Sequence, residues 1–457
     1  MWFNLETRGF VARVSSFFVF VGHTVFMLIR FLVAVFFFVS SLAYAQIPAS
    51  WNIVDPKFAA LPNAKAFFGT RAGVFAGSYA YRMELPNTWN GDLVMYAHGN
   101  KGLNPDLNAD FIPIRKWFID NGFAWASSSF SANGWAVRQG ADETKDLAEF
   151  FASSVAKPKR TFIVGGSMGG NVVTDSLGNF PIFYAGAMPL CGVMTGLELF
   201  DYFLSYALVG EYISGVNLSL NGSIATVNLV GFFFEKYFGG LLPILGKPKA
   251  YTAKGQQFDS VIKHLSGGER PYRLEGMLVE SAPEVSLYAT QFVGAGFGVF
   301  NHNIDKQVTT NLGVEYRIDP NLGLDVGLLN KNVRRVAANS DARILEGRYW
   351  YGIPSGRIFV PVMSYHTTGD ALVPVNMQVS YRQKVESRGR GDLLVQRFIR
   401  RPGHCEFTDA EVIEGFSDLV KWVDTGKKPE GDNALGDLSN VGIRWTKPLR
   451  DDDPAKK

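Results

Sequence analysis

The stretch TFIVGGSMGGNVV, residues 161–173, decides the fold. An apolar run rich in β-branched residues meets a glycine cluster with Ser167 at its centre, and a helix-compatible run follows. This is the pattern G-x-S-x-G, in which a strand turns sharply into a helix and raises the serine hydroxyl above the sheet. Larger side chains in place of Gly165 and Gly169 would collide with the adjacent strand and helix. The pattern predicts a nucleophilic serine; the alternative is a glycine-rich structural turn with a solvent-facing serine.

Strand and helix patterns alternate on both sides of this stretch. Continuous apolar runs are typical of strands covered on both faces, and they occur at 91–99, 123–135, 160–167 and 183–192, the second of which ends in a loop. Helix patterns separate them, at 111–122, 141–155 and 170–180. The alternation predicts parallel βαβ units, preceded by an antiparallel hairpin at 66–86. It resumes with segments at 356–370, 376–387, 392–404 and 408–426.

The alternation breaks in the middle of the chain. Between 195 and 350 the sequence offers a helical stretch, an aromatic-rich run (NLVGFFFEKYFGGLLPILG) and loops. We therefore predict an α/β core in two halves, 46–194 and 351–428, with a cap or lid inserted at 195–350, because a surface loop tolerates long insertions. A C-terminal tail follows at 429–457, and its charged end, KPLRDDDPAKK, predicts disorder.

Bulk composition limits the possible classes of partner. The chain has 457 residues, 47% of them hydrophobic, and a net charge of +3. This gives ample material for a core, and no basic run marks a nucleic-acid surface. We expect no nucleic-acid partner.

The N-terminus reads as an export signal. MLIRFLVAVFFFVSSLAYAQ, residues 27–46, places Arg30 before an apolar run that ends in small residues. This predicts a signal peptide at 1–45, cleaved between Ala45 and Gln46, and a periplasmic or secreted protein. A true start at Met27 would explain the second apolar run upstream. An uncleaved anchor is the alternative, but the run is shorter than the ~20 residues that a span needs, so we expect no membrane span after cleavage.

A serine nucleophile needs a base and an acid that orients the base. Of the six histidines, His404 follows the last predicted strand, in a loop that can bring a base over Ser167. Asp370 follows an earlier apolar strand and a glycine that permits a tight turn. The chain order Ser167, Asp370, His404 predicts a catalytic triad. Glu406 and Asp409 also lie near His404 in sequence, and we interpret them as acids at a helix N-terminus.

The developing negative charge needs two backbone N–H donors. We predict one from Met168, the residue after the nucleophile. The other is predicted from Asn100, in the loop HGNKG after the strand at 91–97, where Gly99 allows a close approach. His98 is predicted to be structural.

With these pieces in place, the chain resembles the α/β-hydrolase superfamily. The resemblance spans most of residues 60–425, less the insertion, and rests on AHGN, GGSMG, GDALVP and GHC. It implies Ser167 as nucleophile, His404 as base and Asp370 as orienting acid. It also implies an eight-stranded, mostly parallel sheet flanked by helices, with a large, mainly helical cap inserted after the sixth strand.

The pair His404-Cys405 is also similar to the tannase and feruloyl esterase group, in which a cysteine beside the histidine is bonded to one beside the serine. Here Gly166 precedes Ser167, so the sequence departs from that pattern. The second of the two cysteines is Cys191, at the end of the strand that follows the nucleophile helix. The resemblance suggests a Cys191–Cys405 disulfide; two buried free thiols are the alternative.

The predicted reaction is hydrolysis of a carboxylic ester through an acyl-enzyme, with no cofactor and no metal ion. The predicted partner is a small-molecule or oligomeric ester with an apolar or aromatic group, because aromatic residues of the insertion could line its pocket. These residues could instead form the core of the cap. Asn133 and Trp135 are expected to border the pocket. Two other functions stay open: an exported prolyl-oligopeptidase-like serine peptidase, and a non-catalytic binding protein on the same fold.

Overall fold

The computed structural model describes residues 50–102, 104–218, 232–279, 307–341, 343 and 350–456. The predicted signal peptide at 1–45 lies outside these residues, as does part of the aromatic-rich run. Gln46–Lys457 forms one compact unit by its internal contacts. Among the described residues, no helix has both the length and the apolarity needed to cross a bilayer.

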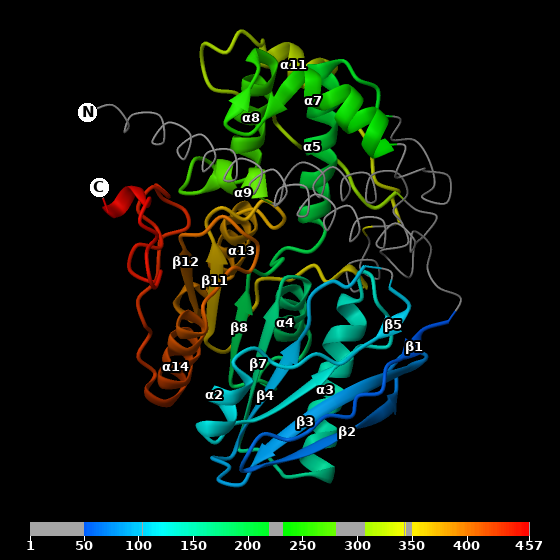
Figure 1. The fold of residues 1–457 in the computed structure, drawn as a ribbon, viewed down its shortest axis with the longest axis vertical. Coiled ribbons are helices and arrows are strands. Elements are labelled where there is room, and N and C mark those ends of the chain that lie inside the picture. The colour runs from blue at the N-terminus through cyan, green and yellow to red at the C-terminus, as the bar shows by residue number, and fades with distance from the viewer. Residues whose placement is uncertain are drawn as a thin grey trace, which may run out of the picture. The chain divides into compact units, whose positions relative to one another are not determined.

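The core of the molecule is an eight-stranded sheet with the spatial order β12-β11-β8-β7-β4-β6-β3-β2 (Figure 1). Its strands are β2 (Ala64–Ala72), β3 (Ser78–Pro86), β4 (Asp92–Ala97), β6 (Ala124–Ser128), β7 (Arg160–Gly166), β8 (Gly186–Leu190), β11 (Val362–Thr367) and β12 (Leu394–Ile399). The pairs β2–β3 and β3–β6 are antiparallel and all others are parallel. The predicted hairpin and parallel strands are therefore confirmed. A separate short pair joins β1 (Asn52–Ile53) to β5 (Asp106–Leu107).

Helices cover both faces of this sheet. Their bounds are α2 (Arg115–Asp120), α3 (Val137–Ser154), α4 (Met168–Asn179), α13 (Asn376–Ser387) and α14 (Asp409–Thr425), with short 3-10 turns η3 (Gly391–Leu393) and η4 (Pro454–Lys456). Helices α3, α4 and α13 pack in one apolar cluster and α2 and α14 in another, as expected for a parallel sheet buried on both sides. The chain has the α/β-hydrolase fold.

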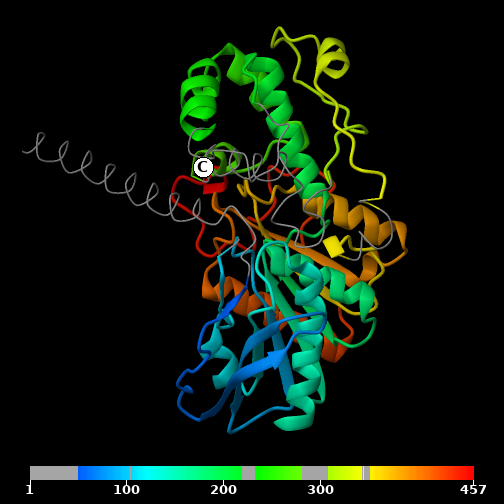
Figure 2. The ribbon, with the colours of Figure 1, turned by 90° about the vertical axis from the view of Figure 1, so that its right-hand side faces the viewer.

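Between β8, the sixth strand of the sheet along the chain, and β11, the regular structure of the described residues is mainly helical. It contains α5 (Glu198–Ser214), the π-helix η2 (Phe232–Leu241), α7 (Leu242–Leu245), the pair β9 (Gly246–Lys247) and β10 (Ala250–Tyr251), α8 (Ala253–Leu265), α9 (Arg273–Val279) and α11 (Val326–Asn332). Figures 1 and 2 show these helices gathered beyond one end of the sheet.

The two ends of this insertion meet. A Cβ atom on Gly196 would lie 2.5 Å from the carbonyl oxygen of Gly352, so the backbones touch. Asn171 of α4 donates a hydrogen bond to the same carbonyl over 2.8 Å. The chain thus leaves the core and returns to it at one place.

The prediction of disorder for the charged end of the tail is wrong. Asp453 is fully buried and pairs with the buried guanidinium of Arg400, at the end of β12, over 2.8 Å. Trp445 is also buried, and the guanidinium of Arg397 lies 3.7 Å from its ring centroid. A buried arginine needs a counter-charge. The acidic tail supplies one to Arg400, which composition alone could not reveal.

Candidate active site

Ser167 lies at the sharp turn between β7 and α4. Its backbone has φ 57° and ψ −121°, a conformation that non-glycine residues rarely adopt. A Cβ atom on Gly165 would lie 2.3 Å from the carbonyl oxygen of Gly169, and one on Gly169 would lie 2.0 Å from that of Ala97. Both glycines are therefore required for the steric reason predicted from the sequence.

Loops after β11 and β12 bring Asp370 and His404 to Ser167. The Ser167 hydroxyl donates to Nε2 of His404 over 2.9 Å, and Nδ1–H of His404 donates to Oδ2 of Asp370 over 2.7 Å. Asp370 is fully buried, whereas the His404 side chain is 17% exposed. The three residues predicted to form a triad are thus joined by hydrogen bonds.

A buried histidine that sequence reasoning did not assign supports the loop of Asp370. The second carboxylate oxygen of Asp370 accepts from the backbone N–H of Val373 over 2.7 Å. The carbonyl of Val373 in turn accepts from Nε2 of His366 over 2.7 Å, and Gln378 donates to Nδ1 of His366 over 3.2 Å. Burial lowers the pKa of His366 to about 4, so its ring is neutral at pH 7, with one donor and one acceptor nitrogen. The sequence signal that could have identified this role is the position of His366 inside an apolar strand, four residues before Asp370.

The loop after β4 lies against Ser167. A Cβ atom on Gly99 would come within 3.3 Å of Cβ of Ser167, which explains the glycine. Within the described residues, the backbone N–H groups of Met168 and Asn100 have no hydrogen-bond partner. The side chain of Asn100 accepts from the N–H of Gly102 over 2.8 Å and closes the turn of the loop.

His98, Asn133 and Trp135 brace the loops around the site. The ring nitrogens of His98 lie 2.7 Å from the carbonyl oxygen of Gly99 and 3.0 Å from that of Ser129, and burial lowers its pKa to about 4. Asn133 donates to backbone carbonyls in the segment that contains β5. Trp135 donates to a carbonyl at the end of the insertion, over 3.1 Å. All three side chains are buried.

The acids near His404 in sequence have structural roles. Helix α14 begins with a capping box in which Thr408 and Glu411 bond each other's backbone N–H. Asp409 lies in the first turn of this helix, as predicted. Glu406 lies before the helix and accepts from the N–H of Gly403 over 2.9 Å, so its assignment to the helix N-terminus is wrong.

The predicted disulfide between Cys191 and Cys405 is present. Their Cα atoms are 5.2 Å apart and 214 residues separate them in sequence. Cys191 follows β8, and Sγ of Cys405 lies 3.6 Å from Nε2 of His404. Among the described residues, the two sulfurs and His404 form the one cluster with metal-ligand geometry, but both sulfurs are committed to the disulfide.

Removal of this disulfide is predicted to lower stability. Replacing both cysteines by alanine removes the constraint on a long loop of the unfolded chain, so we expect the free energy of unfolding to fall by about 2–5 kcal/mol. Chemical denaturation measures the change. Reductant should shift the unfolding midpoint of the wild-type protein but not that of the Cys191→Ala/Cys405→Ala variant. Equal midpoints for the two oxidised proteins would contradict the prediction.

Helix α9 of the insertion lies directly on the loops of the triad. A Cβ atom on Gly276 would lie 1.7 Å from the carbonyl oxygen of Gly369 and 2.7 Å from that of Pro402. These carbonyls precede Asp370 and His404 by one and two residues. The insertion therefore helps to hold both loops. The sequence gives no sign of this contact, because Gly276 is only a glycine within a short helical pattern.

The described aromatic residues of the insertion mainly pack against each other. An apolar cavity between its helices has a volume of about 30 Å³ and is lined in part by Tyr206, Tyr237, Leu241, Phe258 and Met277. Pockets for drug-sized ligands have volumes of about 300–1,000 Å³, so this cavity is far too small to hold a substrate. These side chains thus form a core of the insertion, the alternative left open by the sequence.

Comparison with known proteins gives one curated relative and many distant structures. No family model matches the chain. A stretch of 115 residues is 29% identical to an o-phthalyl amidase from Xanthobacter agilis; it covers 23% of this chain and only a quarter (25%) of the amidase. An esterase from Aspergillus oryzae aligns over 84% of this chain and 92% of its own, with 12% identity and a TM-score of 0.44. Feruloyl esterase B from Aspergillus oryzae aligns over 80% of this chain and 81% of its own, with 14% identity and a TM-score of 0.41.

Proposed function

We propose that the protein is a serine hydrolase that cleaves carboxylic esters. The observation that carries the proposal is the hydrogen-bonded series Ser167, His404 and Asp370, with the serine on a strained turn between strand and helix. A nucleophile, a base in contact with it and a buried acid behind the base are the parts that acyl transfer needs.

In the proposed reaction, Oγ of Ser167 attacks the ester carbonyl while Nε2 of His404 takes the hydroxyl proton. His404 then gives this proton to the leaving alkoxide, and an acyl-enzyme forms. A water molecule, deprotonated by His404, attacks the acyl carbon and releases the acid. Asp370 keeps the proton of Nδ1 in place and stabilises the imidazolium. We assign the backbone N–H groups of Met168 and Asn100 to the carbonyl oxygen, because both are free to donate among the described residues.

Amide hydrolysis is the second candidate, and the stretch shared with the amidase favours it. Ser167, His404 and Asp370 would have the same roles in this reaction. His404 must protonate the leaving nitrogen as its bond to the acyl carbon breaks. The Cys191–Cys405 disulfide supports our further proposal that the protein is exported, since disulfides persist in oxidising compartments.

A matched panel of substrates tests the proposal. Initial rates are measured with p-nitrophenyl esters from acetate to palmitate and benzoate, and with the p-nitroanilides of the same acids. We expect hydrolysis of esters at rates well above those of the matching anilides, because the ester is the better electrophile and has the better leaving group. Faster cleavage of anilides would transfer the assignment to an amidase. If neither esters nor anilides are cleaved above the uncatalysed rate, the result would favour a non-catalytic binding function for this fold.

A further inference from the structure

Arg270 differs from the other buried arginines of the described residues in having no carboxylate partner. The others form ion pairs, which are Arg138–Asp142, Arg273–Asp259, Arg397–Asp418, Arg400–Asp453 and Arg401–Glu411. Arg270 lies between α8 and α9 and is only 5% exposed. A buried cation is normally balanced by an anion, because the loss of its hydration is costly. The position of Arg270 therefore calls for an explanation.

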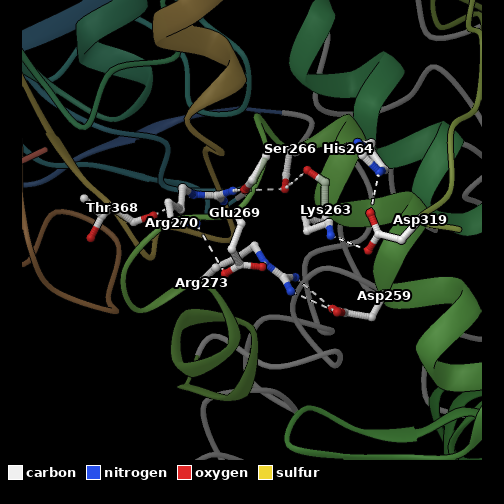
Figure 3. A network of polar contacts seen from close by, with 10 residues as sticks. Asp259, Lys263, His264, Ser266, Glu269, Arg270, Arg273, Asp319 and Thr368 are labelled. Carbon is white, nitrogen blue, oxygen red and sulfur yellow. Dashed lines mark hydrogen bonds and ion pairs between the residues drawn. The ribbon is translucent and has the colours of Figure 1, made fainter. Parts of the chain in front are cut away.

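The side-chain contacts of Arg270 are all with neutral acceptors, whereas its backbone N–H donates to the carboxylate of Glu269 over 3.3 Å. Its Nε donates to the carbonyl of Thr368 over 2.7 Å, and its Nη1 donates to the hydroxyl of Ser266 over 3.2 Å (Figure 3). Nη1 also donates to the carbonyl of Gly268 over 2.8 Å. Its Nη2 has no acceptor among the described residues. Burial lowers the pKa of Arg270 to about 10, so the side chain is still a cation at pH 7. One edge of a charged guanidinium is thus left without a partner.

Figure 3 also shows that the acidic side chains near Arg270 form ion pairs with other cations. Glu269 contacts the guanidinium of the neighbouring Arg273 over 3.2 Å, and Asp259 holds the same guanidinium with both oxygens. Farther along the network, Asp319 pairs with Lys263 and His264. The acids drawn in this network are engaged by other cations.

A second unpartnered donor of the insertion lies on α5, which packs against α8, the helix that precedes Arg270. Tyr202, on α5, is 5% exposed, and its buried hydroxyl has no hydrogen-bond partner among the described residues. Burial raises the pKa of Tyr202, and the positive charge of Arg270 opposes that rise. The charge of Asp370 acts on both side chains. Arg270 is thus bonded to the loop of the proposed catalytic acid, and the hydroxyl of Tyr202 is a neutral unpartnered donor on the helix packed against α8.

We propose that Nη2 of Arg270 and the hydroxyl of Tyr202 bind a carboxylate carried by the substrate. This inference rests on the proposed function and names its substrate class: monoesters of dicarboxylic acids and other esters with a free carboxylate. Each carboxylate oxygen would accept one of the two donors, and a hydrogen bond from a cation to an anion is among the strongest available. These two donors match the two oxygens of a carboxylate, whereas a phosphate would bring an oxygen for which they offer no partner.

Arg270 also bonds Thr368, two residues before Asp370, so a purely bracing role is the competing explanation. A brace would affect all esters alike. A carboxylate site would affect only esters that carry the charge. The ratio of kcat/KM for a charged ester to that for its uncharged match separates these two roles.

The test uses mono-p-nitrophenyl esters of adipic, pimelic and suberic acids and the same esters with the free acid capped as a methyl ester. We expect the wild-type protein to prefer at least one free acid over its capped form, and Arg270→Met to reduce that preference by about 10- to 100-fold. Tyr202→Phe should reduce it less, because the lost donor is neutral. Tyr206→Phe, one turn along α5, is the matched control and should leave the ratio unchanged.

Several outcomes would overturn the carboxylate site. One is a wild-type protein without preference for the free acids; another is Arg270→Met slowing both ester classes equally. If Arg270→Met does not fold, Tyr202→Phe and Arg270→Lys provide the same comparison. If no ester is cleaved, the proposed function fails, and the site is tested by calorimetric titration of monomethyl adipate into Ser167→Ala with and without Arg270→Met. Equal binding by those two proteins would refute the site.

Discussion

Ser167→Ala is expected to lower kcat for every ester cleaved by the wild-type protein by about 10⁵- to 10⁶-fold. The reason is structural: without Oγ no acyl-enzyme can form, and the donors assigned to the carbonyl oxygen have no tetrahedral intermediate to stabilise. The small side chain of alanine leaves the turn between β7 and α4 as unhindered as before. Initial rates with the best ester of the panel, corrected for spontaneous hydrolysis, measure the loss.

Labelling separates loss of the nucleophile from loss of the fold. A fluorophosphonate should add one mass increment to the wild-type protein and none to Ser167→Ala, while both proteins unfold at the same temperature. Ser153→Ala is the matched control, because Ser153 is an exposed serine on α3. It should keep full activity and labelling. Activity of Ser167→Ala within tenfold of the wild-type rate would rule out Ser167 as the nucleophile.

Asp370→Asn should lower kcat by about 10⁴-fold while the protein stays folded. Oδ2 of Asp370 accepts the Nδ1–H of His404, which fixes the tautomer whose Nε2 faces the Ser167 hydroxyl. An amide nitrogen in that position would donate to Nδ1 and leave the proton on Nε2, where it blocks removal of the serine proton. The negative charge that stabilises the imidazolium would be lost as well.

The measurement is kcat with the same ester, together with its dependence on pH. Asp409→Asn is the matched control, since Asp409 is an acid in the first turn of α14 and has no contact with the triad among the described residues; it should retain most of the activity. Asp370→Glu tests geometry at constant charge and should also be strongly impaired, because Asp370 is fully buried and held by the N–H of Val373. Near-normal kcat in Asp370→Asn would refute the assigned acid.

The parts of the site that follow from local sequence could be predicted. The turn at Ser167 is dictated by glycines two residues on either side, and the loops of Asp370 and His404 follow apolar strands that a parallel sheet brings to one edge. The order of these residues along the chain then suffices to propose a triad. The disulfide came from a resemblance together with the count of only two cysteines.

The parts that depend on contacts between distant segments could not be predicted. Nothing in the sequence near Gly276 indicates that its backbone meets the carbonyl of Gly369, and no periodicity links Arg400 to Asp453. No sequence signal distinguishes Arg270 from an exposed arginine, yet the structure places it in the interior without a carboxylate partner among the described residues. Such features arise from packing of the insertion and the tail on the core, and sequence spacing carries no information about them.

The contact between Gly196 and Gly352 affects how the insertion can evolve and how it can be engineered. An insertion whose ends meet can be lengthened, shortened or exchanged without disturbing the register of the sheet. Specificity can therefore evolve there while the proposed catalytic residues stay in place. The contact between Gly276 and Gly369 limits this freedom. A transplanted cap would need a glycine where Gly276 meets the loop of Asp370, because a larger residue there would collide with the carbonyl of Gly369. The unit of exchange is therefore the cap together with the loop that it supports.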